Sequence, residues 1–187
     1  MRKPLPMKKL LLLITLFSLP LFAQKQHSFI FENNQLEWVK VFESSLSKSD
    51  IEKIIKTKGV FKDLNFDDKL INGSVENIKC DYETLGKSKW FTSFYIQNTN
   101  VSFSFYIRFK EGRYRVVLNN INLKTIDELS TSDITVMSVN GVNQLSTYAI
   151  KKTKFRKSFL KSDAEIYEFT FTNLFNFNNY KKNSDDW

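Results

Sequence analysis

Side chains able to do covalent or acid–base chemistry are few in this sequence of 187 residues, which holds one histidine, His27, and one cysteine, Cys80. A cysteine nucleophile needs a base within hydrogen-bond reach. His27 lies near the N-terminus, where chains usually fray, and Cys80 lies in a predicted strand, so pairing them would require the chain end to dock onto a sheet. We expect instead that Cys80 is a buried, small apolar side chain.

Local enzyme and metal motifs are missing as well: the sequence has no G-x-S-x-G, HExxH or CxxC. The segment from Asp63 to Asp67 begins like a calcium loop, but Asp68 stands at its sixth position, where glycine is needed, and Ser74 at its twelfth, where glutamate is needed. Asp67 and Asp68 are sequence neighbours, so they do not face one substrate as paired catalytic carboxylates do. We therefore predict no catalytic residue, no metal site and no cofactor.

Basic residues offer the more informative chemistry, and they form two groups. The first lies on one predicted hairpin and includes an aromatic residue: Tyr106, Arg108, Lys110, Arg113 and Arg115. The second lies between positions 151 and 161: Lys151, Lys152, Lys154, Arg156, Lys157 and Lys161. Cations beside an aromatic side chain could bind an anionic partner or single-stranded nucleic acid, or could simply keep a sheet face solvated and resistant to aggregation. For binding, the candidate residues are Tyr106, Arg108, Arg113 and Arg115.

The first basic group is positioned by a β-hairpin between Val101 and Leu118. Apolar residues alternate with polar ones along this stretch, as in a strand with one buried face. Glu111 and Gly112 form a two-residue turn, because glycine accepts the positive φ that such turns need. This turn places the apolar residues opposite one another on one face and pairs like charges on the other. The predicted pairs are Phe109–Tyr114, Ile107–Val116, Phe105–Leu118, Arg108–Arg115 and Lys110–Arg113.

Before the hairpin, the pattern predicts a short strand near Phe29, a turn at 33–34 and a main strand over 35–43. A helix is expected over 48–58, because Ser47 can cap its first turn together with Asp50, and Gly59 can end it. Residues 60–68 are expected to form a loop or short helix. A second strand is expected over 69–82, where a change of parity indicates a bulge near Gly73. A further short strand is expected near 91–96.

After the hairpin, the strand is expected to extend toward Leu123, and the remaining pattern is ambiguous. Asn140-Gly141 favours a hairpin turn, although residues 142–150 could equally begin a helix. The basic segment 151–161 is expected to be exposed. For residues 162–175 we predict a helix with a capping box at Ser162 and Glu165, in preference to a strand suggested by the alternation of residues 169–172.

The N-terminus has the features of a secretory signal peptide. Four basic residues precede an apolar run over 10–22, and Ala23 provides a small residue at the cleavage position. The run is short for a membrane span of roughly 20 residues, so we predict cleavage after Ala23 and no transmembrane helix in the mature chain; a retained anchor is the alternative. Loss of four positive charges from a net charge of +8 leaves +4. With one cysteine, an exported chain has no intrachain disulfide and relies on packing.

Several segments carry a family resemblance: Phe31, LEWVKV at 36–41, Ile71-Asn72-Gly73, and 109–116 with Gly112-Arg113-Tyr114-Arg115 as its most specific part. In these segments, over about 29–123, the chain resembles the domain of unknown function 4468 family, exported bacterial domains described as having a fold like that of the TATA-binding protein. The resemblance implies an antiparallel sheet with helices on one face. It implies no chemistry and no DNA binding, because fold does not determine function.

We therefore predict an α+β fold: a twisted antiparallel β-sheet with helices packed on one face (TBP-like), with a β-α-β-β-β core and a C-terminal helical extension. The expected organisation is a signal peptide at 1–23, a core domain at 24–123, an extension at 124–180 that completes the same domain, and a polar tail at 181–187. The expected function is a non-enzymatic binding or envelope-associated module in the periplasm or outside the cell, whose partner is an anionic envelope component or protein. The small mature charge and export argue against nucleic acid. The alternative is a hydrolase-like enzyme with dispersed site residues.

Overall fold

The computed structural model describes residues 27–126 and 141–180. The predicted signal peptide at 1–23, Asn140 of the predicted turn and the predicted tail at 181–187 lie outside these ranges. Among the described residues, seven strands form one antiparallel sheet in the order β1-β2-β6-β5-β4-β3, with β7 also pairing with β6. The strands are β1 (Phe29–Glu32), β2 (Gln35–Glu43), β3 (Phe61–Asp67), β4 (Leu70–Lys79), β5 (Thr99–Lys110), β6 (Arg113–Thr125) and β7 (Val142–Gln144).

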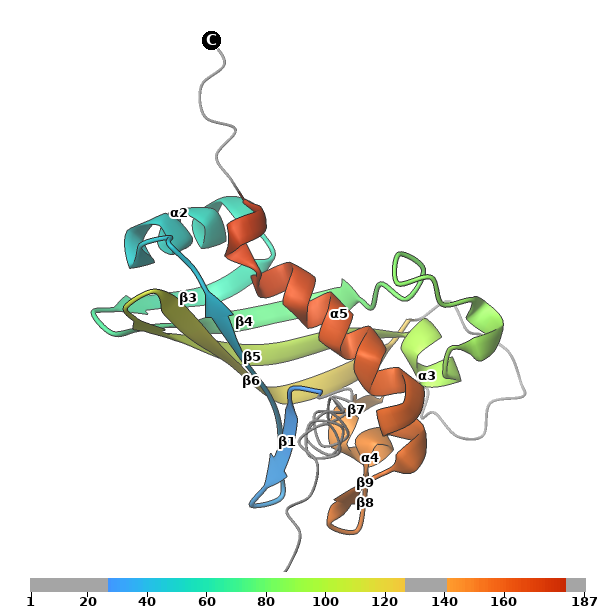
Figure 1. The fold of residues 1–187 in the computed structure, drawn as a ribbon. Coiled ribbons are helices and arrows are strands. Elements are labelled where there is room, and N and C mark those ends of the chain that lie inside the picture. The colour runs from blue at the N-terminus through green and yellow to red at the C-terminus, as the bar shows by residue number, and fades with distance from the viewer. Residues whose placement is uncertain (1–26, 127–140, 181–187) are drawn as a thin grey trace, which may run out of the picture.

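Helical segments and one small hairpin complete the fold (Figure 1). The helical segments are α2 (Lys48–Lys58), the 3₁₀ turns η1 (Lys89–Phe91) and η3 (Phe177–Asn179), the short helices α3 (Phe94–Gln97) and α4 (Leu145–Ala149), the π-helical turn η2 (Phe159–Asp163), and α5 (Ala164–Phe175). The hairpin joins β8 (Ile150–Lys151) to β9 (Lys154–Phe155). Figure 1 shows α5 lying across one face of the sheet, with α2 near its C-terminal end. The predicted α+β class, with helices on one face of an antiparallel sheet, is confirmed.

The central hairpin has the predicted register. Arg108 lies opposite Arg115, Lys110 opposite Arg113, and the three apolar pairs are formed as expected. The turn residue Gly112 has a φ of 69°, which glycine adopts without strain. The strand also extends beyond Leu118 as expected, past a bulge at Asn120. Turn chemistry and alternation therefore agree on one pairing, and this hairpin forms the middle of the sheet.

Helix α2 begins and ends where its capping residues predict. Ser47 and Asp50 form a reciprocal capping box, and Gly59 ends the helix in the left-handed conformation with a φ of 64°. Its Ile51 and Ile55 side chains are completely buried. Lys58 at the end of α2 donates a 2.9 Å hydrogen bond to the Leu174 carbonyl oxygen, which ties α2 to α5.

Two segments differ from the prediction. Residues 61–67, expected as a loop or short helix, form strand β3, in which Asp63 has a φ of 50° at a bulge against β4. This bulge shifts the alternation, so Phe61 and Phe66 both face the core although their spacing is odd. Residues 91–96, expected as a strand, belong to η1 and α3. The predicted bulge in β4 is present, between Val75 and Ile78.

Helix α5 is present as predicted, but it begins differently. Asp163 occupies the position before it, and the chain enters α5 through the π-helical turn η2 instead of a capping box at Ser162 and Glu165. The alternation of residues 169–172 is therefore part of a helix that is apolar around much of its circumference. Phe171 packs edge-on against Trp38 and Phe103, with ring centroids 5.6 and 5.2 Å away.

Aromatic side chains fill the space between α5 and the sheet. The Tyr114 hydroxyl on β6 donates a 2.8 Å hydrogen bond to the Phe175 carbonyl oxygen and accepts one of 3.0 Å from the Phe177 amide. These bonds satisfy backbone groups at the C-terminal end of α5, where the helix itself supplies no partners. The end of α5 is therefore fixed to the central hairpin. Within residues 27–126 and 141–180, no helix covers the opposite face of the sheet (Figure 1).

Candidate basic groove and amide cleft

The face of the sheet turned away from α5, here called the open face, is best described in rows of residues paired across the strands. One row runs Leu70–Arg108–Arg115–Val41 through β4, β5, β6 and β2. On the side of the Glu111-Gly112 turn, the next row is Lys110–Arg113–Glu43. On the other side, it is Asn72–Tyr106–Val117–Val39. The cations of the hairpin thus fill two adjacent rows at one end of the sheet.

The first row, together with Lys110 and Arg113 of the second, lines a groove of about 870 Å³. Its lining residues come from four strands and the β3–β4 turn: Val41, Asp68, Lys69, Leu70, Arg108, Phe109, Lys110, Arg113, Tyr114 and Arg115. We call this the basic groove. Five of its side chains are cationic, and one, Asp68, is a carboxylate. Val41, 49% exposed on the floor, adds apolar surface that remains in contact with water.

None of the five cations of the basic groove forms an ion pair within the described residues, although Glu43 lies opposite Arg113 in the register. The ion pairs within residues 27–126 and 141–180 join Lys40 to Glu168, Lys48 to Glu52 and Lys87 to Glu165, all outside the groove. Instead, the hairpin register places Arg108 directly opposite Arg115 and Lys110 directly opposite Arg113. Like charges that face each other across two strands are unfavourable. The folded chain retains this repulsion, and an anion bound between the two cations would reduce it.

Tyr106 borders the basic groove and holds one of its cations. The Arg108 guanidinium carbon lies 5.2 Å from the centre of the Tyr106 ring, within the range of a cation–π contact. Val117, beside Tyr106 in the register, is completely buried although its position in the strand points to the open face. The Tyr106 ring therefore helps to hold the guanidinium in place, which reduces the freedom that Arg108 would lose on binding.

The structure brings the four predicted binding residues together and adds others. Arg108, Arg113 and Arg115 line the groove and Tyr106 forms its border. Lys69, Leu70 and Val41 were missed by the sequence reasoning, because they reach this surface only through the pairing of β4 with β5 and of β2 with β6. The second basic group lies on and after the β8–β9 hairpin, at the other end of the molecule (Figure 1). There Arg156 donates hydrogen bonds to the carbonyl oxygens of Ile150 and Thr147, a structural role.

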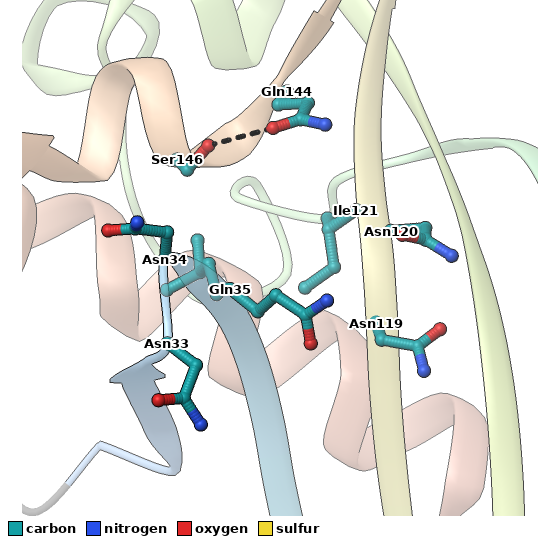
Figure 2. Close-up of a pocket in the computed structure, with 9 residues that line it drawn as sticks. Asn33, Asn34, Gln35, Asn119, Asn120, Ile121, Gln144 and Ser146 are labelled. Atoms are coloured by element: carbon teal, nitrogen blue, oxygen red, sulfur yellow. Dashed lines mark hydrogen bonds between the residues drawn. The ribbon is translucent and has the colours of Figure 1, made fainter.

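A second cavity, of about 360 Å³, opens between β2 and β6 (Figure 2). It exists because β2 pairs with β6 only as far as Trp38–Leu118, whereas β7 pairs with β6 from Asn122 onward. Its lining is mainly carboxamide: Asn33, Asn34, Gln35, Leu36, Asn119, Asn120, Ile121, Gln144 and Ser146. We call it the amide cleft. Figure 2 shows Gln35 reaching from β2 toward β6, and Ile121 pointing into the gap.

The amide cleft has no ionisable side chain in its lining, so it offers hydrogen bonds without charge. The Asn119 Oδ1 atom is buried and has no hydrogen-bond partner among the described residues. Ser146 and Gln144 hydrogen-bond each other at 3.3 Å across the top of the cleft. A neutral polar molecule fits this chemistry, whereas acid–base or nucleophilic catalysis does not.

Cys80 and His27 have the surroundings of structural residues. Burial raises the pKa of the Cys80 thiol to about 12, outweighing a hydrogen bond with Thr170 that lowers it, so the thiol stays protonated at neutral pH and is a poor nucleophile. The expectation that Cys80 is a buried thiol is confirmed. The His27 ring packs edge-on against Phe155, with centroids 5.2 Å apart. Asp63 accepts a 2.6 Å hydrogen bond from the Ser74 hydroxyl at the β3 bulge.

Two carboxylates on and beside α5 hold the chain together. Glu168 accepts hydrogen bonds from the Ser28 amide and hydroxyl, from Trp38 Nε1 and from Lys40 Nζ, at 2.7 to 3.1 Å. Partial burial would raise the pKa of the Glu168 carboxyl, but these bonds outweigh burial and hold the pKa below its ordinary value. Asp163, which is buried, accepts hydrogen bonds from the hydroxyls of Ser93, Tyr95 and Ser162. Both carboxylates are fully hydrogen-bonded, and each of them links segments that are distant in the sequence.

Neither a metal centre nor a membrane span is found in the described part of the chain. Within it, no three histidine, cysteine, aspartate or glutamate side chains lie close enough together to hold a metal ion. Of the helices in the same residues, none combines the length and the apolar character needed to cross a membrane.

No protein-family model matches the sequence, and the curated proteins give no match. Two solved structures are similar in fold. One is a TBP-like protein from Parabacteroides distasonis ATCC 8503, with a TM-score of 0.49 and 14% identity over 79% of this chain and 92% of that chain. The other is a DUF4468 family protein from Bacteroides ovatus ATCC 8483, with a TM-score of 0.45 and 15% identity over 79% of this chain and 88% of that chain. Both descriptions agree with the resemblance seen in the sequence, and at this identity the likeness concerns the fold alone.

Proposed function

We propose that this chain is a non-enzymatic binding module that holds an anionic partner in the basic groove. The observation that carries the proposal is the set of five cations that lie together and form no ion pair within the described residues. Arg108 and Arg115 are the central pair, because they face each other across β5 and β6 beside the apolar side chains of Leu70 and Val41. Arginine binds carboxylates and phosphates in a two-pronged geometry.

The proposed location is the cell envelope or the cell exterior, after cleavage near Ala23. This part of the proposal rests on the basic, apolar and small-residue pattern of residues 1–23. The partner class that follows is an anionic envelope component or an acidic surface of another exported protein. Nucleic acid is a poorer fit for two reasons. The mature chain carries a net charge of only +4, and an exported protein meets little nucleic acid.

Binding is preferred over hydrolysis because of the groups that line the basic groove and the amide cleft, two of the cavities in the described structure. The basic groove offers cations and one carboxylate on an open sheet face, and the amide cleft offers carboxamides and one hydroxyl. A general acid or base must lie within hydrogen-bond reach of the reacting group, and a nucleophile needs an activating partner. Neither cavity presents such a pair, whereas charge and apolar surface together are sufficient for recognition.

The test is a pull-down from native envelope with the chain beginning at Gln24 as bait. The variant Arg108→Glu/Arg115→Glu reverses the central pair, and both positions are exposed, so we expect it to fold. The matched control is Lys154→Glu/Lys157→Glu, which makes the same change in net charge on the exposed second basic group. Circular dichroism and a denaturant midpoint must first show that all three proteins are folded.

We expect the parent and the control to retain the same partner, to lose it as salt is raised, and the groove variant not to retain it. Binding through five cations is weakened by screening, since the Debye length falls from about 10 Å at 0.1 M salt to about 3 Å at 1 M. Retention of the same partners by the groove variant would overturn the assignment. Loss from both charge variants alike would show a non-specific effect of net charge and would equally reject the groove.

A further inference from the structure

The two most exposed large apolar side chains among the described residues are neighbours in the segment between β4 and β5, and a third exposed ring follows them there. Trp90 is 94% exposed and Phe91 84% exposed, both in the turn η1, and Phe94 at the start of α3 is 48% exposed. We call these three side chains the aromatic tip. Single exposed apolar residues are ordinary on protein surfaces, but a cluster of large aromatic rings in water usually marks an interaction site.

The aromatic tip is held in a fixed shape by hydrogen bonds to its backbone. The Gln97 side-chain amide donates to the carbonyl oxygens of Lys89 and Thr92, at 2.9 and 2.6 Å. The Thr92 hydroxyl donates to the Ser88 carbonyl oxygen at 3.0 Å. A surface held in its binding shape before contact loses less conformational entropy on binding. The fixed backbone therefore favours a binding role for the exposed rings.

The base of the tip is anchored in the protein core. Ser93 and Tyr95, on either side of Phe94, both donate hydrogen bonds to the buried Asp163 carboxylate, at 2.7 and 2.8 Å. The Tyr95 ring stacks on Tyr148 with centroids 4.3 Å apart. The aromatic tip is therefore connected through α3 to the C-terminal part of the chain, so its position relative to the rest of the domain is fixed.

We propose that the aromatic tip inserts into the interfacial region of a phospholipid bilayer. Exposures of 94% and 84% mean that the Trp90 and Phe91 rings project from the surface instead of lining a groove that a partner side chain could fill. Three aromatic side chains offer a few hundred Å², at roughly 150–250 Å² each, whereas a stable protein interface buries about 800 Å² on each partner. A bilayer needs no matching surface, and tryptophan favours its interface.

Charge beside the tip agrees with a lipid headgroup. Lys89, next to Trp90, is exposed and forms no ion pair within the described residues, so its ammonium group is free to meet a phosphate. Lys87 instead pairs with Glu165 at 2.9 Å and braces the loop against the start of α5. The tip precedes the first residue of β5 and the basic groove lies near its last, so they lie at opposite ends of a strand about 35 Å long. Figure 1 shows this separation between α3 and the β5–β6 turn.

The test uses the chain beginning at Gln24, because the apolar run 10–22 would itself enter vesicles. Large vesicles of phosphatidylcholine are the probe, since a zwitterionic surface gives the basic groove little to bind. Cosedimentation is compared for the parent, Trp90→Ala/Phe91→Ala, the conservative Trp90→Phe, and Val142→Ala. Val142 is 63% exposed on β7 and controls for a general loss of exposed apolar surface.

We expect the parent, Trp90→Phe and Val142→Ala to cosediment, and the apparent affinity of Trp90→Ala/Phe91→Ala to fall by about tenfold or more. Tryptophan emission gives a second readout. Trp38, which is completely buried, and Trp187 are common to both proteins, so the difference spectrum between the parent and Trp90→Phe isolates Trp90. It should shift to shorter wavelength on addition of vesicles and be quenched by lipids brominated near the headgroup.

Two results would overturn the proposal. One is a parent that does not cosediment, or a double variant that cosediments as well as the parent. The other is a concentration-dependent increase in mass without lipid that the double variant abolishes, measured by light scattering, because this would identify the tip as a contact between two copies of the chain. The double variant removes only side chains that are largely in water, so its folding should be intact, and an unchanged denaturant midpoint verifies this.

Discussion

Along β5 and β6, the side chains that point toward α5 are almost all aromatic or aliphatic, whereas those that point away are cationic, amide or hydroxyl groups together with one tyrosine and one valine. The same backbone therefore supports two surfaces with opposite chemistry. Burying five unpaired cations beneath a helix would carry a large desolvation cost, so they are compatible with this fold only because α5 covers the other face. The comparison indicates that the open face is suited to binding, whereas the covered face provides most of the stability of the fold.

The largest expected effect lies on the covered face. Phe171→Ala removes a completely buried ring that packs against Trp38 and Phe103, and should lower the free energy of unfolding by about 3–5 kcal/mol. On the open face, Tyr106→Ala should change it by no more than about 1 kcal/mol. Urea denaturation followed by circular dichroism measures both. Equal losses from the two variants would contradict the division of roles between the faces.

Substitution of Gly73 by alanine tests the covered face by adding volume instead of removing it. A Cβ atom there would lie 2.7 Å from the Lys62 carbonyl oxygen and 3.0 Å from the Phe105 ring. The carbonyl belongs to the β3–β4 pairing and cannot move freely, so Gly73→Ala should cost about 1–3 kcal/mol. Asn72→Ala, the neighbouring position on the open face, is the control and should cost less. A Gly73→Ala variant as stable as the parent would show that β3 adjusts easily.

Glu168→Gln should lower the free energy of unfolding by about 1 kcal/mol, after allowance for the partial exposure of the carboxylate. The pKa of Glu168 is lowered in the folded state, so its contribution is complete above the ordinary carboxyl pKa and is lost as pH falls through the lowered value. Denaturant midpoints measured from about pH 7 to about pH 3 should therefore converge for parent and variant at the acid end. Glu52→Gln, which breaks the i,i+4 ion pair with Lys48, is the control for loss of a single ion pair. Midpoints that stay equally far apart at every pH would exclude the carboxylate as the cause.

The smallest effect should have the opposite sign. Arg115→Glu places a carboxylate opposite Arg108, so it should stabilise the fold by about 0.2–1 kcal/mol by replacing a repulsive pair with an attractive one. The same substitution should weaken retention of the anionic partner. Thermal or urea denaturation at low salt measures the gain, which should shrink at high salt. A loss of stability would mean that the two arginines do not repel each other in the folded protein.

Much of the fold could be predicted because its signals are local. Glu111 and Gly112 set the register of the hairpin, and Ser47 with Gly59 set the limits of α2. Strand β3 was missed because Asp63 adopts a left-handed conformation that shifts the alternation of its neighbours. Residues 91–96 were predicted to form a short strand, because without knowledge of burial their aromatic residues look like the buried half of an alternating pattern.

The candidate sites were less predictable, because they depend on contacts between distant segments. The sequence placed Arg108 and Arg115 opposite each other, but Lys69 reaches the groove through the β3–β4 turn, and Val41 through pairing that joins β2 to β6. The amide cleft requires β2 to leave β6 and β7 to join it 4 positions further along, where Asn122 follows Leu118. No local sequence pattern around Gln35 or Asn119 predicts that β2 separates from β6 at this point.

Strand β3 is the last strand on its side of the sheet, so one row of its backbone groups has no neighbouring strand in the described structure. Exposed borders of this kind invite a second molecule to add a strand, and proteins discourage this with bulges and charged side chains. β3 has both, since Asp63 interrupts its pairing and Lys62 and Asp67 carry opposite charges along it. At the opposite border, β1 offers only the four residues Phe29–Glu32. Sheet extension is thus disfavoured at both margins, and a partner that docks onto this sheet is directed to its surface.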